Sequence, residues 1–149
     1  MFGLQEMLLT NSKSPSFPGF SILTKNSLND RATGGVALLI DNSYLFSEVQ
    51  LNTPLQAVAA RVTSSKAVTV CNIYIPPSVD VSLSDLEQLI QQLPAPVVLV
   101  GDFNALSPQM VEKLLDDYNL CLLNTGEPTA EHWRFDRADW MSFRSLCAS

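Results

Sequence analysis

The sequence predicts a mixed α/β (α+β) fold, on the basis of three observations. Short apolar segments of strand length, separated by turn-forming residues, fill the first half of the chain. Two segments with apolar residues at helical spacing then alternate with further strand candidates. The 149 residues, of which 46% are hydrophobic and 16% charged, suffice for one domain with a core and exclude a disordered chain.

The first half of the chain is expected to be mainly β-structure. Residues 1–19 include a stretch rich in Ser, Pro and Lys and are expected to form an exposed loop. The strand candidates that follow are Phe20–Leu23, Gly35–Ile40, Tyr44–Leu51, Gln56–Val62 and Ala67–Ile75. The first two are expected to pair as a hairpin with a long loop. Alternation in the last strand places Asn72 and Tyr74 on one face, and Cys71 and Ile73 on the other.

The second half alternates helices and strands. Ser84–Glu87 has the pattern of a capping box, with Ser84 as the N-cap of a helix that ends at Pro94. Val97–Val100 is a continuous apolar run, as expected for a strand that is covered on both faces. Ser107-Pro108 predicts the start of a second helix, because proline is favoured at the first helical position. Leu120–Leu123 is a further strand candidate.

Charge and cysteine usage narrow the possible functions. The net charge of −6 gives no general attraction to a phosphate backbone, so a nucleic-acid partner would require a bound cation. Three widely spaced cysteines form neither a disulfide framework nor a zinc cluster. No apolar run is long enough to span a bilayer, and the first residues do not resemble a signal peptide. We therefore expect a soluble intracellular protein with no membrane partner.

The most specific motif is Gly101-Asp102-Phe103-Asn104, which follows the apolar run before it. Asp102 and Asn104 are two positions apart, so they share a face in an extended chain while Phe103 turns into the core. A carboxylate beside a carboxamide suits a hard cation or a phosphoryl oxygen. The alternative is an Asx turn that simply closes the strand.

Two further residues are candidates. Tyr74 lies near the end of its strand, just before Pro76-Pro77, where its hydroxyl can position a phosphate; the alternative is an aromatic residue of the core. Glu6 follows Leu4-Gln5 and can be a metal ligand at a strand end, although most such glutamates are simply solvated.

In chain order, Leu4-Gln5-Glu6, then a strand that ends in Tyr74-Ile75-Pro76, then Gly101-Asp102-Phe103-Asn104 resemble the motifs of the endonuclease/exonuclease/phosphatase superfamily, and most closely those of the endonuclease domain of jockey-like non-LTR retrotransposons. The segment Arg31–Ala37 between the motifs and the segment Leu122–Thr129 after them support the resemblance, which covers roughly residues 4–129. It implies a four-layer α/β/β/α sandwich, incomplete in this chain. It also implies divalent-metal-dependent hydrolysis of phosphodiester bonds, with DNA nicked as the substrate.

The resemblance also implies roles for single residues. Glu6 matches the glutamate that binds Mg²⁺ or Mn²⁺, and Tyr74 matches a tyrosine near the scissile phosphate. Asp102 matches the aspartate that orients or activates the nucleophilic water, and Asn104 matches its neighbour that contacts the phosphate. The oligomeric state is left open.

The departures from the family are equally informative. The family pattern starts with a strand that carries an asparagine and ends with strands that carry an aspartate and Ser-Asp-His, and this chain has none of them. Residues 130–149 instead resemble the connector downstream of the endonuclease, so we expect a partial domain over 1–129 and a tail over 130–149. His132, the only histidine, matches no motif.

We therefore expect a truncated and internally deleted domain, with weak metal binding and with nicking lost or severely impaired. Two alternatives stay open. One is a non-catalytic α/β module that keeps residual metal or partner binding. The other is a working nuclease of minimal form.

Overall fold

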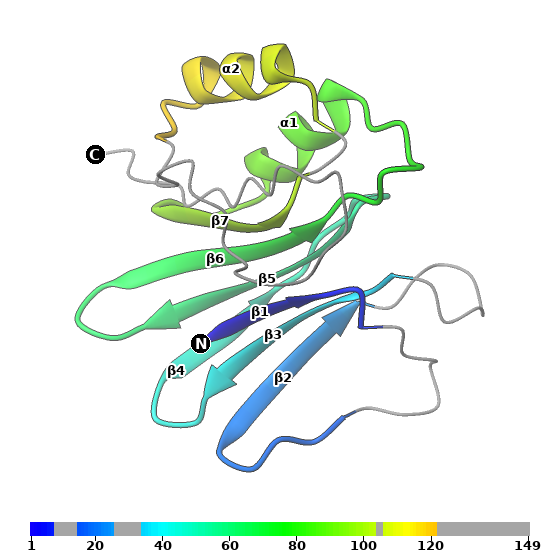
Figure 1. The fold of residues 1–149 in the computed structure, drawn as a ribbon. Helices are drawn as coiled ribbons and strands as arrows, with labels where there is room; N and C mark the ends of the chain where they lie inside the picture. Colours follow the sequence, from blue (N-terminus) through cyan, green and yellow to red (C-terminus); the bar gives the residue numbers. More distant parts are fainter. Residues whose placement is uncertain (8–14, 26–33, 104–105, 122–149) are drawn as a thin grey trace, which may run out of the picture.

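Two β-sheets and a layer of helices are stacked in this protein (Figure 1). The structure is a computed structural model that describes residues 1–7, 15–25, 34–103 and 106–121. The three-stranded sheet is antiparallel, with the strand order β1-β3-β2. Its strands are β1 (Phe2–Gln5), β2 (Phe20–Lys25) and β3 (Val36–Asp41).

The four-stranded sheet has the order β4-β5-β6-β7. Its strands are β4 (Leu45–Val49), β5 (Gln56–Thr63), β6 (Ala67–Tyr74) and β7 (Val97–Asp102). The first three strands are antiparallel, whereas β7 runs parallel to β6. A parallel pair needs a crossover connection, and helix α1 (Leu83–Gln91) provides it.

Strands β5, β6 and β7 of the four-stranded sheet are covered on both faces, and their side chains alternate between two cores, whereas β4 at the edge is mostly exposed. The inter-sheet core consists of Val36, Leu38, Ile40, Val58, Ala60, Val70 and Tyr74. The helix-side core includes Cys71, Ile73, Leu86, Leu89, Leu99 and Phe103. The alternation predicted for β6 is therefore confirmed, and so is the continuous apolar pattern of β7.

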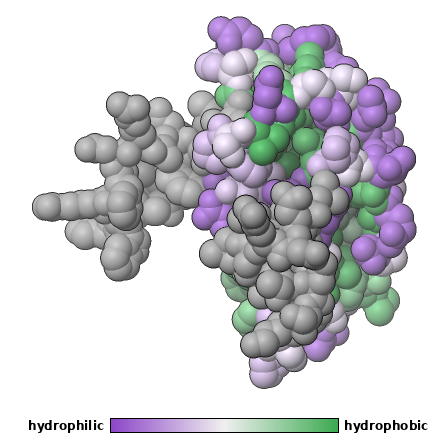
Figure 2. Space-filling model, turned by 90° about the vertical axis from the view of Figure 1, so that its right-hand side faces the viewer, coloured by the Kyte–Doolittle hydropathy of each residue, from purple (hydrophilic) through white to green (hydrophobic). Residues whose placement is uncertain are grey.

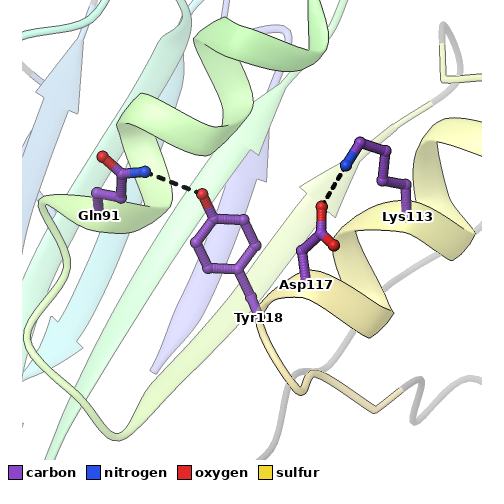
Figure 3. A network of polar contacts seen from close by, with 4 residues as sticks. All are labelled: Gln91, Lys113, Asp117 and Tyr118. Atoms are coloured by element: carbon purple, nitrogen blue, oxygen red, sulfur yellow. Dashed lines mark hydrogen bonds and ion pairs between the residues drawn. The ribbon is translucent and has the colours of Figure 1, made fainter.

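The helical layer consists of α1 and α2 (Pro108–Asp117). In Figure 3, Gln91 at the end of α1 donates a hydrogen bond to the Tyr118 hydroxyl (3.1 Å), and Lys113 pairs with Asp117 within α2. The first contact joins the two helices. Figure 2 shows polar residues around a patch of apolar side chains in the upper part of the molecule, where the helices lie.

Several expectations about these elements are confirmed. β2 and β3 form the expected antiparallel pair, and Ser107 caps α2 with Pro108 at the first helical position. The layered α+β architecture also agrees with the predicted class. Of the four expected layers, the described residues form three. No helix in the described part of the chain is long and apolar enough to cross a membrane.

Two expectations are wrong. Residues 2–5 form a strand rather than a loop, because they pair along β3. The N-cap of α1 is Ser82 and not Ser84: the Ser82 hydroxyl accepts a hydrogen bond from the Asp85 amide at 3.1 Å. The earlier start brackets the cap with two buried apolar residues, Val81 and Leu86, in the arrangement of a hydrophobic staple.

The strand expected at 120–123 is only partly covered by the structure. Leu120 and Cys121 are not in a strand, and the other two residues lie outside the described ranges. The expected tail over 130–149 also lies outside them.

Candidate functional site

Three of the four predicted site residues lie at the strand ends on one edge of the two sheets. The Tyr74 hydroxyl, at the end of β6, donates a hydrogen bond of 2.6 Å to the Glu6 carboxylate, which follows β1. In the parallel pairing of β6 with β7, Tyr74 lies opposite Asp102. Residues that are 68 positions apart in sequence thus meet at this edge.

Tyr74 combines two environments. Its ring belongs to the inter-sheet core and the residue is only 6% exposed, whereas its hydroxyl reaches Glu6 at the rim. Burial raises the pKa of the phenol well above its usual value, and the hydrogen bond to Glu6 and the charges of Glu6 and Asp102 raise it further. At neutral pH the Tyr74 hydroxyl is therefore a hydrogen-bond donor and not a base.

Glu6 is exposed and has an unusual backbone conformation. Its φ is 52°, in the left-handed region that few residues other than glycine and asparagine adopt. The next residue is tied back to the three-stranded sheet, because the Met7 amide donates to the Gly35 carbonyl at 3.3 Å. The Gly35 amide in turn donates to the Gln56 side chain at 2.6 Å.

Asp102 is 6% exposed and shares the inter-sheet face with the preceding Val98 and Val100. Its carbonyl accepts a hydrogen bond of 3.0 Å from the Ile75 amide, which extends the β6–β7 pairing past Tyr74. Phe103 points the other way and is buried in the helix-side core, as the alternation predicted.

Gly101 allows β6 and β7 to lie this close together. Its φ is +142°, and a Cβ at this position would lie 1.8 Å from the Ile73 carbonyl oxygen. No side chain fits there, so glycine is needed for the register that places Asp102 opposite Tyr74.

Asn104 and His132 both lie outside the described residues. The role that the resemblance implies for Asn104 is therefore still a prediction.

The donors at this edge match the ligand chemistry of a hydrated divalent cation. Glu6 and Asp102 supply two carboxylates, and within the described residues no group of three His, Cys, Asp or Glu side chains could hold a metal ion. Mg²⁺ is commonly held by one or two carboxylates, with water molecules and substrate phosphates completing its shell. The chemistry of these two carboxylates therefore agrees with Mg²⁺ or Mn²⁺.

Asn72 is the main residue near the site to which the sequence motifs gave no role. It is fully buried on the same face of β6 as Tyr74, and its side chain contacts β1 just before Glu6. One feature of the sequence indicates that Asn72 has a specific role, because its amide stands at an inward-facing position of a mainly apolar strand. That pattern does not reveal which strand the amide contacts.

Comparison with known proteins agrees with the predicted fold. No family model matches the sequence, and no curated protein matches it. Among solved structures, the chain is similar to the endonuclease domain of TRAS1, a telomere-specific non-LTR retrotransposon, with a TM-score of 0.60 and 17% sequence identity. The similarity covers 87% of this chain and 64% of that structure. The chain therefore has the fold of a non-LTR retrotransposon endonuclease domain, as its motifs predicted.

Proposed function

We propose that this chain is a retrotransposon-derived, jockey-like endonuclease domain whose chemistry is divalent-metal-dependent hydrolysis of DNA phosphodiester bonds. The contact between Tyr74 and Glu6, beside Asp102, is the observation that supports this most directly. Three separate sequence motifs meet there on a fold shared with a retrotransposon endonuclease domain. We place the partial domain at residues 1–129, with 130–149 as a tail, in an intracellular protein.

Each residue has a defined part in this proposal. Glu6 holds the Mg²⁺ or Mn²⁺ ion, and Asp102 orients the attacking water and accepts its proton. The Tyr74 hydroxyl, which stays protonated, fixes the Glu6 carboxylate and faces the phosphate. Asn104 contacts the phosphate. When bound, the metal supplies charge neutralisation of the phosphate.

We propose further that nicking by this 149-residue chain is lost or severely impaired. Its only histidine, His132, matches no motif of the family. General acid–base catalysis by a positioned side chain typically contributes roughly 10²–10⁴-fold. The two carboxylates at the site also hold a metal only weakly.

The test is a plasmid-nicking assay with purified protein and Mg²⁺ or Mn²⁺. Asp102→Ala serves as the control for contaminating nucleases. We expect no nicking above that control. Robust nicking by the unmodified chain that Asp102→Ala abolishes would show that this minimal site suffices for catalysis.

A measurement of metal binding distinguishes the proposed nuclease-type site from a domain that binds no divalent metal. Calorimetry should detect weak binding of Mg²⁺ or Mn²⁺ that Glu6→Gln abolishes, because the amide keeps the shape of the side chain but not its charge. Binding of DNA should be weak and should disappear with EDTA, since a protein of net charge −6 attracts phosphates only through a bound cation. Tight metal binding, or binding that Glu6→Gln leaves unchanged, would contradict the site assignment.

A non-catalytic module that keeps metal or partner binding is the second candidate. The absence of a third metal-ligating side chain among the described residues favours it. This candidate predicts metal binding with no nicking at all, whereas a severely impaired nuclease shows slow nicking at high protein concentration that Asp102→Ala abolishes.

A further inference from the structure

A single buried amide joins the two sheets next to the proposed site. Asn72 is 0% exposed and lies on the inter-sheet face of β6, between Val70 and Tyr74 of the inter-sheet core. Its Nδ2 donates to the carbonyls of Leu4 (2.9 Å) and Ala37 (2.8 Å), and its Oδ1 accepts from Gln5 Nε2 (2.7 Å). Both amide hydrogens and the carbonyl oxygen are thus used, as a buried amide requires.

Two of these three contacts are made to the residues just before Glu6. Leu4 and Gln5 are the last residues of β1, a strand of only four residues. Asn72 also lies two positions before Tyr74 on the same face of β6. Strand β6 therefore holds the main chain before Glu6 through Asn72, and its Tyr74 hydroxyl donates a hydrogen bond to the Glu6 carboxylate.

The sequence of β1 leaves room for this amide. A Cβ at Gly3 would lie 3.1 Å from the Asn72 side chain, closer than most such contacts. The absence of a side chain at residue 3 lets β1 settle on Asn72. Gly3 and Asn72 therefore form a matched pair across the two sheets.

We propose that Asn72 is a positioning residue that fixes the end of β1 and so holds the Glu6 carboxylate against Tyr74. This inference rests on the proposed function for the view that Glu6 is a metal ligand. Glu6 needs such support, because it is exposed and its backbone is left-handed. On its other side the Met7 amide donates a 3.3 Å hydrogen bond to the Gly35 carbonyl. If the role of Asn72 were stability alone, the placement of Glu6 would not depend on it.

The first test is metal affinity in Asn72→Leu, which keeps the branch at Cγ but removes the polar contacts of the side chain. The control is Val70→Ala, which damages the same core from the same face of β6 without a polar link to β1. We expect affinity for Mn²⁺ to fall about tenfold in Asn72→Leu, as is typical when a partner of a metal ligand is lost, and to stay unchanged in Val70→Ala. Equal affinity in Asn72→Leu and the unmodified chain would overturn the inference.

The second test needs no metal. With ¹³Cζ-tyrosine labelling, the Tyr74 resonance is assigned from Tyr74→Phe and should shift in Glu6→Ala, which removes the acceptor. We expect Asn72→Leu to shift it in the same direction and Val70→Ala to leave it in place. An unmoved resonance in Asn72→Leu overturns the inference whether or not metal binds. A shifted resonance in a chain that binds no metal would support the role of Asn72 and contradict the proposed function.

A milder variant covers the case in which Asn72→Leu does not fold. Gln5→Met removes only the contact to Asn72 Oδ1 and keeps the two bonds to the strand carbonyls. It should shift the Tyr74 resonance in the same direction by a smaller amount. No shift in folded Gln5→Met would overturn the inference in that case.

Discussion

Glu6 adopts a left-handed backbone conformation that costs energy for a residue with a Cβ. Such residues persist only where the surrounding structure determines them, and they concentrate at functional sites. Here the contacts of Asn72 fix the chain before Glu6, and the Met7 hydrogen bond fixes the chain after it. Glu6 therefore combines a strained backbone with the hydrogen bond that its carboxylate accepts from Tyr74.

This strain predicts an unusual order of stabilities for variants of Glu6. Both Glu6→Ala and Glu6→Gly lose the carboxylate, but only glycine relieves the left-handed conformation. We expect Glu6→Gly to be the more stable by about 1 kcal/mol in urea unfolding. At Glu48, an exposed residue of β4, the order should reverse, because glycine weakens a regular strand. A Glu6→Ala protein as stable as Glu6→Gly would contradict the assigned backbone.

At this scale the sequence predicted which residues lie near one another better than it predicted their contacts. The motif order indicated Glu6, Tyr74 and Asp102, and the structure brings these three together. It did not indicate that Asn72 contacts β1, because alternation in a strand reveals the face of a side chain but not its partner in another sheet.

Among the elements, α1 shows how a local pattern can mislead. Ser-x-x-Asp at 82–85 and Ser-x-x-Glu at 84–87 both fit a capping box, and only tertiary packing decides between them. Starting the helix at Leu83 buries Val81 and Leu86 on the helix-side core.

The cap can be checked by two alanine substitutions. Ser82→Ala removes the acceptor of the Asp85 amide and should cost about 1 kcal/mol in the free energy of unfolding. Ser84→Ala should cost only a few tenths of a kcal/mol or less, because Ser84 is exposed and contacts only the Gln88 side chain. Equal losses in chemical denaturation would show that Ser82 is not the cap.

A second element-scale prediction concerns the β6–β7 pair. Gly101→Ala forces a Cβ into the Ile73 carbonyl, and we expect a loss of about 3 kcal/mol or more. Gly19→Ala is the matched control: Gly19 also has a positive φ (+82°), but nothing lies within 4 Å of the added Cβ. Gly19→Ala should lower the free energy of unfolding only by the roughly 1–2 kcal/mol that a left-handed backbone costs a residue with a Cβ. Similar losses for the two variants in urea unfolding would contradict the close approach of the strands.

Most strands were predictable because their apolar runs are long and are bounded by Gly, Asn or Pro. β1 was missed, since four residues that include a glycine carry almost no periodic pattern. Its strand conformation depends on pairing with β3, which a local pattern does not encode.

For the whole molecule, the important feature is a sheet whose strands β5, β6 and β7 are covered on both faces. Cys71 is fully buried on the helix side of this sheet, and burial raises the pKa of its thiol from the ordinary 9.0 to about 12. Apolar neighbours in the sequence predict buried thiols at both Cys71 and Cys121; the prediction is confirmed for Cys71 and wrong for Cys121, which is exposed. The sequence did not predict how the layers are stacked, which depends on contacts between distant strands.

The raised pKa predicts that stability falls in alkaline solution. In the unfolded chain the Cys71 thiol ionises from about pH 9, whereas in the folded protein it stays neutral up to about pH 12. Its contribution is therefore fully present below pH 9 and is lost between pH 9 and 12, at up to about 1.4 kcal/mol per pH unit. Tyr74, whose pKa is also raised, acts in the same direction above its ordinary value of 10.0.

Urea unfolding at a series of pH values from 8 upward measures this effect. Cys71→Ala should lower stability at pH 8, because it leaves a small cavity, but it should flatten the decline above pH 9. The same slope in Cys71→Ala and in the unmodified chain would show that this thiol is not buried as described.

The contacts between β1 and β6 also determine which parts of the chain are free to change in length. They join residues 67 or 68 positions apart, so a single loop closure brings all of them together. The entropy of closing a loop rises only with the logarithm of its length, so ten more residues between β2 and β3, which would double that ten-residue connection, would cost only about 0.6 kcal/mol. Insertions in that connection can therefore accumulate during evolution while Glu6 and Tyr74 stay in register.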